Sequence, residues 1–358
     1  MARRNGMSRT AIAAAGLGAL LVGRELLARR PGADLSGEVA LITGGSRGLG
    51  FLLAREFARQ GCRVAICARD EAELARAHAD LTGYGATVLA VRCDISDRAD
   101  VERLVEDVTR NYGRIDILVN NAGRIDVGPL TTMTVEDFER SLAVMFWGTV
   151  YPTLAVLPQM RERRHGRIVN ITSIGGKVAV PKLVPYCAAK FAAVGFSAGL
   201  RTELGRYGIQ VTTVVPGLMR TGSYLNAYFK EPSFLAAAFA VLGNLPGTSM
   251  DAERAARRIV EATRRGEVEL TLTLPAELLA RLYGLFPGTV TSLLSLIDRV
   301  LPEGRQRPTA GVRGMEIPAL QESPVLRRLT ALGQSAATRF HQRPGPVHAG
   351  DSAGARSA

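Results

Sequence analysis

The 358-residue chain carries 45 Lys and Arg residues against 33 Asp and Glu residues, which gives a formal net charge of +12 and a pI near 10.1. Hydrophobic residues make up 47% and charged residues 22%, a composition that can fold, so wholesale disorder is excluded. No uninterrupted run of about 18 apolar residues occurs, which excludes a polytopic membrane protein.

The positive charge sits mostly at the two ends of the chain. Residues 1–36 hold six Arg against one Glu and one Asp, and residues 304–358 hold eight Arg against two Glu and one Asp. The termini therefore account for +9 of the +12, and residues 37–303 carry only +3. Because no central basic face follows from this distribution, we expect no nucleic-acid partner.

The N-terminal segment, 1–36, contains an apolar stretch of 13 residues, Ala11–Gly23, between Arg9 and Arg24. As a helix it would be about 20 Å long, which is short for a hydrocarbon core of about 30 Å. A membrane anchor or interfacial helix, a signal peptide after the basic start, a flexible tail and a helix packed on its own domain all remain open. We predict the anchor or interfacial helix, and hence a cytoplasmic protein associated with a membrane through this segment.

From Gly37 onward, short apolar runs alternate with amphipathic stretches. The apolar runs predict strands at Val39–Thr43, Arg63–Cys67, Thr87–Arg92, Ile117–Asn120, Arg167–Thr172 and Gln210–Val215. The amphipathic stretches predict helices at Phe51–Gln60, Glu71–Leu81, Ala99–Tyr112, Val135–Met160 and Tyr186–Arg206. Strands without polar alternation, separated by helices, indicate a parallel sheet buried on both faces. The predicted class is α/β: a single doubly wound Rossmann-type domain with a parallel sheet, an N-terminal apolar helix and a C-terminal extension.

The chain changes character after the sixth strand. Residues 218–250 form an insert of loop and helix whose aromatic residues are Tyr224, Tyr228, Phe229, Phe234 and Phe239. A basic amphipathic helix opening at Asp251 and a final strand at Val268–Leu274 complete a predicted catalytic domain of 37–274. Residues 275–303 are an apolar extension broken at Pro287, and 304–358, rich in Pro, Gly, Ser, Ala and Arg, are predicted to be mostly disordered.

The four cysteines, Cys62, Cys67, Cys93 and Cys187, form no CxxC pair, and the four histidines are scattered. Disulfide frameworks and metal sites need paired spacings. We therefore expect reduced thiols and no structural metal.

Several motifs follow the predicted strands in a fixed order. The first strand runs into Thr43-Gly44-Gly45-Ser46-Arg47-Gly48-Leu49-Gly50, the fourth into Asn120-Asn121-Ala122-Gly123, and the sixth into Pro216-Gly217, with Thr221 just beyond. Ser173 ends the fifth strand, and Tyr186 lies 13 residues later in Tyr186-Cys187-Ala188-Ala189-Lys190. A glycine-rich turn between a strand and a helix lets the backbone approach a pyrophosphate at the helix N-terminus.

Together these motifs resemble the short-chain dehydrogenase/reductase family over residues 37–272. The resemblance implies an oxidoreductase acting on CH–OH and C=O groups, with Tyr186 as general acid and base, Lys190 holding the nicotinamide ribose, and Ser173 bonding the substrate oxygen. The spacing agrees, because residues four apart share a helix face and an ammonium beside a phenol favours phenolate. We expect the pKa of Tyr186 to be lowered.

The cofactor is predicted to be NADP(H). The position where NAD-dependent members carry an acid is Ala68, whereas Arg47 and Arg69 can pair with a 2′-phosphate. Asp94 matches the family's adenine contact. The predicted cofactor-binding residues are Gly44, Ser46, Arg47, Gly48, Leu49, Gly50, Arg69, Asp94, Ile95, Asn120, Ala122, Gly123, Tyr186, Lys190, Pro216, Gly217 and Thr221. Asn120 through Gly123 could equally support the centre of the sheet.

One residue departs from the family pattern. Met145 stands three residues before Gly148, where the family usually has an Asn that helps to hold a water in the proton path. A thioether is at best a weak acceptor. A catalytically weak NADP-binding sensor or scaffold at a membrane therefore remains the alternative to an active enzyme.

The insert of 218–250 corresponds to the family's substrate lid, and its apolar and aromatic content favours a hydrophobic carbonyl or alcohol, such as a lipid, retinoid or steroid-like compound. The same residues could instead pack as core or lie on a membrane. We also expect a homo-oligomer.

Overall fold

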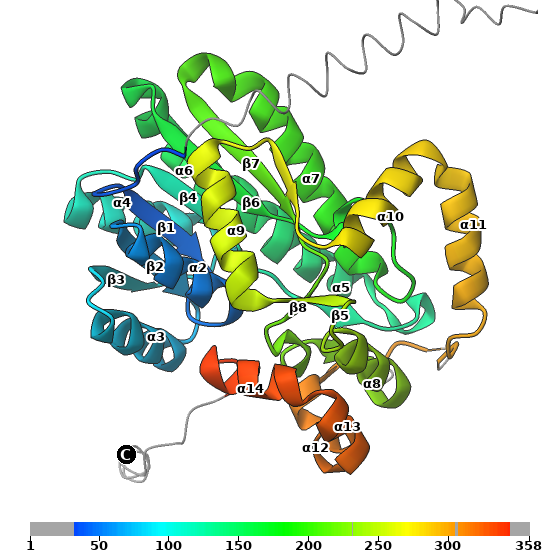
Figure 1. Ribbon diagram of the computed structural model, residues 1–358. Helices are drawn as coiled ribbons and strands as arrows, with labels where there is room; N and C mark the ends of the chain where they lie inside the picture. Colours follow the sequence, from blue (N-terminus) through cyan, green and yellow to red (C-terminus); the bar gives the residue numbers. More distant parts are fainter. Residues whose placement is uncertain (1–31, 231, 305–306, 344–358) are drawn as a thin grey trace, which may run out of the picture.

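The computed structural model describes residues 32–230, 232–304 and 307–343 (Figure 1). The predicted N-terminal apolar helix lies outside the described residues. A seven-stranded sheet forms the centre of the molecule, and every pairing in it is parallel. Its strands are β1 (Val39–Thr43), β2 (Arg63–Ala68), β3 (Val88–Arg92), β4 (Ile117–Asn120), β6 (Gly166–Ile171), β7 (Ile209–Val215) and β11 (Glu269–Thr271).

The strand order is β11-β7-β6-β4-β1-β2-β3, so the chain starts at the middle of the sheet. From β1 it proceeds outward to β2 and β3, then returns to the other side of β1 and builds β4, β6, β7 and β11 outward. The crossovers therefore leave β1 and β4 in opposite directions, which opens a crevice at their carboxyl ends. The predicted doubly wound α/β fold is confirmed.

Helices cover both faces of the sheet. On one face lie α2 (Gly48–Arg59), α3 (Glu71–Gly83) and α9 (Ala252–Arg265), and on the other α4 (Arg98–Tyr112), α6 (Gly148–Arg163) and α7 (Val184–Leu204) (Figure 1). Each layer encloses its own apolar cluster against the strands. Since residues of β1, β4 and β6 are buried whichever face they point to, these strands carry no polar alternation.

The long helix predicted over Val135–Met160 is one helical run with a π-helical segment inside it. It consists of α5 (Val135–Leu142), the π segment η2 (Ala143–Trp147) and α6, and it ends at Arg163. In the described part of the chain this run alone is long and apolar enough to cross a membrane by length and composition. It packs against the sheet through Val156 and Met160, both fully buried, so we read it as a core helix.

The insert after β7 contains short elements. These are β8 (Leu218–Arg220), η5 (Ser223–Leu225), β9 (Tyr228–Phe229), α8 (Pro232–Leu242) and β10 (Ser249–Asp251), with β8 and β10 paired in parallel. Strand β9 pairs with β5 (Asp126–Val127), which precedes α5, and with β12 (Val312–Arg313) from the C-terminal region. Three 3-10 turns, η1 (Leu130–Thr132), η3 (Ile174–Gly176) and η4 (Gly205–Tyr207), lie elsewhere in the loops.

The prediction that 304–358 is mostly disordered is wrong for residues 312–339. Besides β12, this region forms η6 (Gly314–Glu316), α12 (Pro318–Glu322), α13 (Pro324–Leu329) and α14 (Ala331–Arg339). Proline begins two of these helices, where its missing N–H costs nothing. Ile317, Leu320 and Ala337 are buried with Phe229 in a third apolar cluster, so the lid and the C-terminal region share one core.

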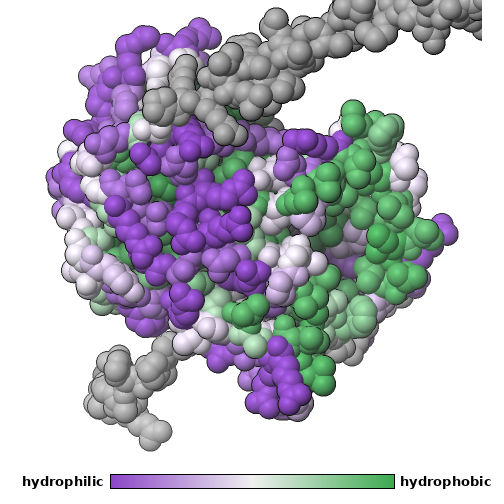
Figure 2. All heavy atoms as spheres, viewed as in Figure 1, coloured by the Kyte–Doolittle hydropathy of each residue, from purple (hydrophilic) through white to green (hydrophobic). Residues whose placement is uncertain are grey.

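The apolar extension predicted at 275–303 is a helical pair. α10 (Leu274–Leu285) and α11 (Pro287–Asp298) pack against each other, and the predicted break at Pro287 is where α11 begins. Leu274 starts α10, so the last strand is shorter than predicted. Several large apolar side chains on the pair are exposed, and Figure 2 shows a hydrophobic surface over this part of the molecule.

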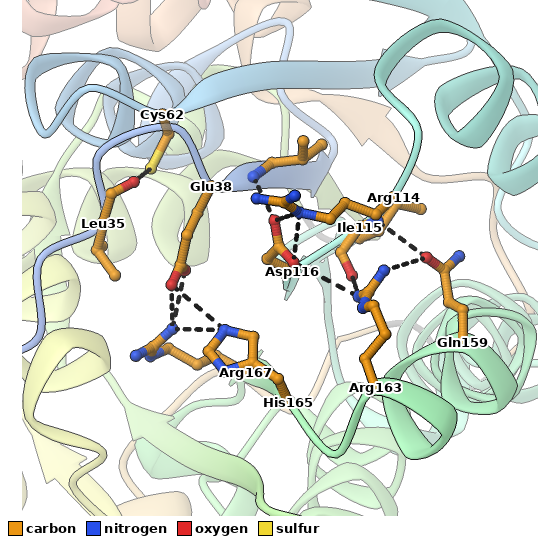
Figure 3. Close-up of polar contacts among 11 residues, drawn as sticks. Leu35, Glu38, Cys62, Arg114, Ile115, Asp116, Gln159, Arg163, His165 and Arg167 are labelled. Carbon is orange, nitrogen blue, oxygen red and sulfur yellow. Dashed lines mark hydrogen bonds and ion pairs between the residues drawn. The ribbon is translucent and has the colours of Figure 1, made fainter.

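A charged network ties the amino ends of the central strands together (Figure 3). Buried Asp116 accepts a hydrogen bond from the Val39 N–H at 3.0 Å and pairs with Arg114 and Arg163. Arg167 donates to the Glu38 carboxylate at 2.8 Å. These groups lie at the opposite edge of the sheet from the crevice, so we assign them to holding β1, β4 and β6 in register.

Candidate active site

A cavity of about 960 Å³ opens at the carboxyl ends of the strands, in the crevice between the two halves of the sheet. Sixteen of the predicted site residues line it: Gly44, Ser46, Arg47, Leu49, Gly50, Arg69, Asp94, Ile95, Ala122, Gly123, Ser173, Tyr186, Lys190, Pro216, Gly217 and Thr221. The fold therefore brings together motifs that are far apart in the sequence.

The glycine loop between β1 and α2 is shaped by two close backbone approaches. Gly44 has φ +63°, and a Cβ placed on it would lie 2.9 Å from the Ala122 Cα. A Cβ on Gly50 would lie 2.1 Å from the Gly44 carbonyl oxygen. Only glycine fits at either place, and the loop leads into the N-terminus of α2. This cradle suits the pyrophosphate of a dinucleotide.

Asn121, which the motif search did not assign, holds this loop in place. Its side-chain amide donates to the carbonyl oxygens of Thr43 and Gly44 at 3.0 and 3.1 Å. The Thr43 hydroxyl accepts from the Asn121 N–H at 3.0 Å. The two loops that follow β1 and β4 are thus fastened to each other across the switch point.

The three predicted catalytic side chains come from the turn that follows β6 and from α7. Ser173 follows β6, and its hydroxyl accepts from the Gly175 N–H at 3.0 Å. Tyr186 and Lys190 lie on one face of α7, and Tyr186 is hydrogen-bonded to Ser173. A phenol, a hydroxyl and an ammonium thus share one wall of the cavity.

The expectation of a lowered Tyr186 pKa is wrong for the protein without ligands. Burial raises the pKa of the phenol to about 12, and the hydrogen bond to Ser173 opposes this only in part. The Lys190 Nζ donates to the Ile171 carbonyl oxygen at 2.8 Å. Tyr186 is therefore a proton donor at neutral pH.

The Lys190 side chain is shielded from solvent. It is buried, and this burial lowers the pKa of the amine to about 8. The ammonium is thus still the main form at neutral pH. A donor fixed by one backbone carbonyl keeps its remaining N–H groups free to hold a bound hydroxyl.

The residues predicted to hold a 2′-phosphate have acidic neighbours. Arg47 Nη1 pairs with Glu73 Oε1 at 2.9 Å, and the Ser46 hydroxyl donates to Glu73 Oε2 at 3.1 Å. Arg69 is exposed, and its Nη1 lies 3.8 Å from Asp94 Oδ2. Arg47 and Arg69 both line the cavity. Glu73, which was not predicted from the sequence, would compete with a 2′-phosphate for Arg47.

Two predicted cofactor residues do not line the cavity. Asn120 is buried in the sheet, where its amide donates to Thr153 and Asn170 at 3.0 and 2.9 Å. Asn120 therefore supports the centre of the sheet, which was the alternative role considered for residues Asn120 through Gly123. Gly48 belongs to the glycine loop but is covered by Gln342 from the C-terminal region.

Met145 lies inside the π-helical segment and is buried away from the cavity. Its carbonyl oxygen accepts from the Thr149 hydroxyl at 2.9 Å. π segments in helices frequently occur at functional sites, and this one lies where the family usually has an Asn.

Apolar side chains line part of the cavity, beside the polar Arg124, Ser223 and Asn244. Its walls include Ile125, Val180, Leu183, Leu218, Phe239 and Leu242. Of the five aromatic residues noted in the insert, Tyr224 and Phe239 line the cavity. Phe229 is core, Tyr228 stacks under Arg124 and Phe234 is exposed, so packing explains part of that aromatic content.

Comparison with known proteins agrees with this geometry. The family model for short chain dehydrogenases matches residues 38–229. The chain is 39% identical over 204 residues to a dehydrogenase/reductase SDR family protein 7-like of Anopheles gambiae, covering 56% of this chain and 64% of that protein. It is 34% identical over 203 residues to human 17-beta-hydroxysteroid dehydrogenase 13, covering 56% of this chain and 66% of that protein. The chain thus spans just under two thirds of the length of both relatives.

A solved structure is also similar. It is a variant of actinorhodin polyketide ketoreductase with NADPH, 29% identical, with a TM-score of 0.58. The match covers 68% of this chain and 98% of the ketoreductase.

Proposed function

The chain belongs to the short-chain dehydrogenase/reductase family, and from that premise we propose that it is an NADP(H)-dependent oxidoreductase of hydrophobic carbonyl and alcohol compounds. One observation carries the proposal: Ser173, Tyr186 and Lys190 meet the glycine loop in a single cavity that is lined in part by apolar side chains. The NADPH in the similar ketoreductase structure and the two arginines at the nucleotide end support the choice of cofactor.

The residues divide the work of carbonyl reduction. When bound, the cofactor supplies the hydride that adds to the carbonyl carbon. Tyr186 gives its phenolic proton to the oxygen, so that the carbonyl becomes an alcohol. The Ser173 hydroxyl donates a hydrogen bond to that oxygen as negative charge develops on it, and the Lys190 ammonium holds the ribose and favours the phenolate that remains. Oxidation of an alcohol reverses each of these steps.

A screen of NADPH oxidation over long-chain and polycyclic carbonyls tests this proposal. The wild-type protein should oxidise NADPH with at least one of these classes, and Tyr186→Phe should lower kcat by roughly 10²–10⁴-fold. NADPH should still bind the variant, as seen by its fluorescence. If carbonyl-dependent oxidation of NADPH is unchanged in Tyr186→Phe, the proposed enzymatic activity is contradicted. If the catalytic efficiency with NADH equals that with NADPH, the proposed preference for NADP(H) is contradicted.

A second candidate is an NADP-binding sensor or scaffold with little turnover. Met145 favours it, because its buried thioether cannot donate the hydrogen bond that an Asn side chain would give. Met145→Asn separates the two readings. If the backbone carbonyl already holds the water, turnover of the variant should stay within about twofold of wild type; a large gain would favour the weakly active reading.

We further propose that the enzyme works at a membrane surface and takes its substrate there. The hydrophobic surface over α10 and α11 includes Leu278, Leu282, Leu285, Phe286, Leu293 and Leu296, each at least half exposed (Figure 2). Apolar patches of this kind mark membrane or protein interfaces. The apolar N-terminal sequence between arginines supports the membrane over a second copy of the chain, which would be the predicted homo-oligomer.

Flotation with anionic phospholipid vesicles distinguishes these partners. The full chain should float with the vesicles, and Leu285→Ser/Phe286→Ser should reduce the bound fraction several-fold. Leu130→Ser, at an exposed leucine in η1, is a matched control that should not change it. If only the oligomeric state changes in the double variant, the surface is an interface between copies.

A further inference from the structure

The residues that follow α14 lie directly on the glycine loop. The Phe340 carbonyl oxygen, just after α14, accepts a hydrogen bond from the Gly48 N–H at 2.8 Å. Two residues later, the side-chain Nε2 of Gln342 lies 2.2 Å from where a Cβ on Gly48 would stand. Gln342 is buried and lines the same cavity as Tyr186. We call residues 340–342 the C-terminal clasp.

The clasp is anchored on both sides of Gln342. The Phe340 side chain is 2% exposed and belongs to the core around α2. The His341 ring meets Phe51 edge-on with centroids 4.7 Å apart, and its Nε2 lies 3.0 Å from Asp80 Oδ2. These contacts join the clasp to α2 and α3, so its position follows from packing and not from one hydrogen bond.

A polar network orients the Gln342 amide. Asn226 Nδ2 donates to the Gln342 backbone oxygen at 2.9 Å and to its Oε1 at 2.7 Å. Since Oε1 is the accepting end, the Nε2 end is directed toward Gly48. Among the described residues no acceptor bonds that Nε2 group. Asn226 Oδ1 is in turn held by Arg47 and Arg313 at 2.9 and 3.2 Å.

We propose that Gln342 is a cofactor-binding residue, and that its Nε2 group donates a hydrogen bond to a phosphate oxygen of NADP(H) from outside the part of the chain that the family model matches. The inference rests on the proposed function. Arg47 is already paired with Glu73, whereas Arg313 forms no ion pair among the described residues, so Arg313, the Gln342 amide and the N-terminus of α2 are left to meet an anion at this corner of the cavity. The clasp is thus the outer wall of the nucleotide site, and release of the cofactor is slowed by it.

Fluorescence titration with NADPH and stopped-flow release measure this directly on the full chain. Gln342→Ala should raise the Kd for NADPH about tenfold and speed release similarly, because a hydrogen bond to a charged group is lost. Gln342→Glu should weaken binding further, since a carboxylate repels phosphate. Gln342→Lys, which restores a donor, should bind as tightly as wild type or more so.

Thr338→Ala is the matched control, because the Thr338 hydroxyl is exposed and bonds only within α14, to the Gln334 carbonyl oxygen. Its Kd should equal that of wild type. Melting temperatures of the ligand-free variants show whether α14 stays folded. If Gln342→Ala and Gln342→Glu bind NADPH as tightly as wild type, or more tightly, the assignment of Gln342 is overturned while the proposed function stands. A wild-type protein that binds no NADPH overturns both.

Discussion

At the scale of single residues, the protonation of Tyr186 decides which direction of the reaction runs easily. Burial keeps the pKa of the phenol at about 12, so the proton that reduction consumes is present at every physiological pH. Oxidation needs the phenolate. As long as the pH is below that pKa, the phenolate fraction rises tenfold with each unit by which the pH increases. If this protonation persists with cofactor bound, we expect the proposed enzyme to reduce carbonyls more readily than it oxidises alcohols.

Rates measured in both directions between pH 6 and 7 check this bias. In that range Lys190, with a pKa of about 8, is still mostly charged. The rate of alcohol oxidation should rise about tenfold per pH unit, and the rate of carbonyl reduction should change little. Tyr186→Phe should abolish the slope. A flat oxidation profile in the wild-type protein would show that Tyr186 is not the base.

Glu73 is expected to lower the affinity of the protein for NADPH. Its carboxylate engages Arg47 and Ser46, two groups that a 2′-phosphate would use. Glu73→Gln removes this competing charge, so the Kd for NADPH should fall roughly three- to tenfold while the Kd for NADH stays the same. An equal gain for both cofactors would mean that Glu73 acts on the fold and not on the 2′-phosphate.

Most of the candidate site could be predicted from sequence, because motifs such as the glycine loop and Tyr186-to-Lys190 are local. Glu73, Asn226 and Gln342 could not, since they reach the cavity only through packing between distant segments. The Tyr186 pKa was also out of reach: spacing shows that an ammonium is near, but not that burial outweighs it.

At the scale of elements, the six strands from β1 to β7 in the sheet were predictable to within one residue, because double-sided burial leaves uninterrupted apolar runs, whereas β11 ends three residues earlier than predicted. The π segment at 143–147 was not, since helical periodicity continues through it. The sequences of α10 and α11 are as apolar as that of a helix buried in the core. Only the packed structure shows that many of their apolar side chains are exposed.

A buried ion pair connects the lid to α5. Lys230 and Asp137 contact each other at 5% and 1% side-chain exposure, and Lys230 also donates to the Thr132 carbonyl oxygen. Lys230→Met leaves a buried carboxylate, which Arg140 compensates only from the surface. Unfolding free energy should fall by about 3 kcal/mol in a urea titration. Lys230→Met/Asp137→Leu should recover much of that loss; a single variant as stable as wild type would contradict this account.

At the scale of the whole molecule, residues 312–343 of the C-terminal region are part of the folded body. Composition suggested disorder because Pro, Gly and Arg are frequent there, yet a few apolar residues at the right positions bury themselves against the lid. Packing between segments that are far apart in the sequence cannot be predicted from the composition of a short stretch of sequence. The lid, the clasp and the glycine loop consequently form one connected unit around the cavity.

Truncation measures how much this unit contributes. A protein of residues 32–303 lacks buried Ile317, Leu320, Ala337 and Phe340, whereas one of residues 32–343 keeps them. Loss of a side chain such as Phe340 alone costs about 3–5 kcal/mol, so the shorter protein should melt roughly 5–15 °C lower. Equal melting temperatures would show that the C-terminal region is dispensable for the fold.

The central claim is hydride transfer between NADP(H) and a hydrophobic carbonyl at Tyr186. Mass spectrometry of the alcohol formed from NADPH deuterated at either position of C4 tests it, with a long-chain aldehyde and a polycyclic ketone as substrates. We expect one of the two deuterated forms to label the carbinol carbon with one deuterium, and Tyr186→Phe to slow labelling by at least about 100-fold. An unlabelled product from both forms, or equally fast labelling in the variant, would contradict the account.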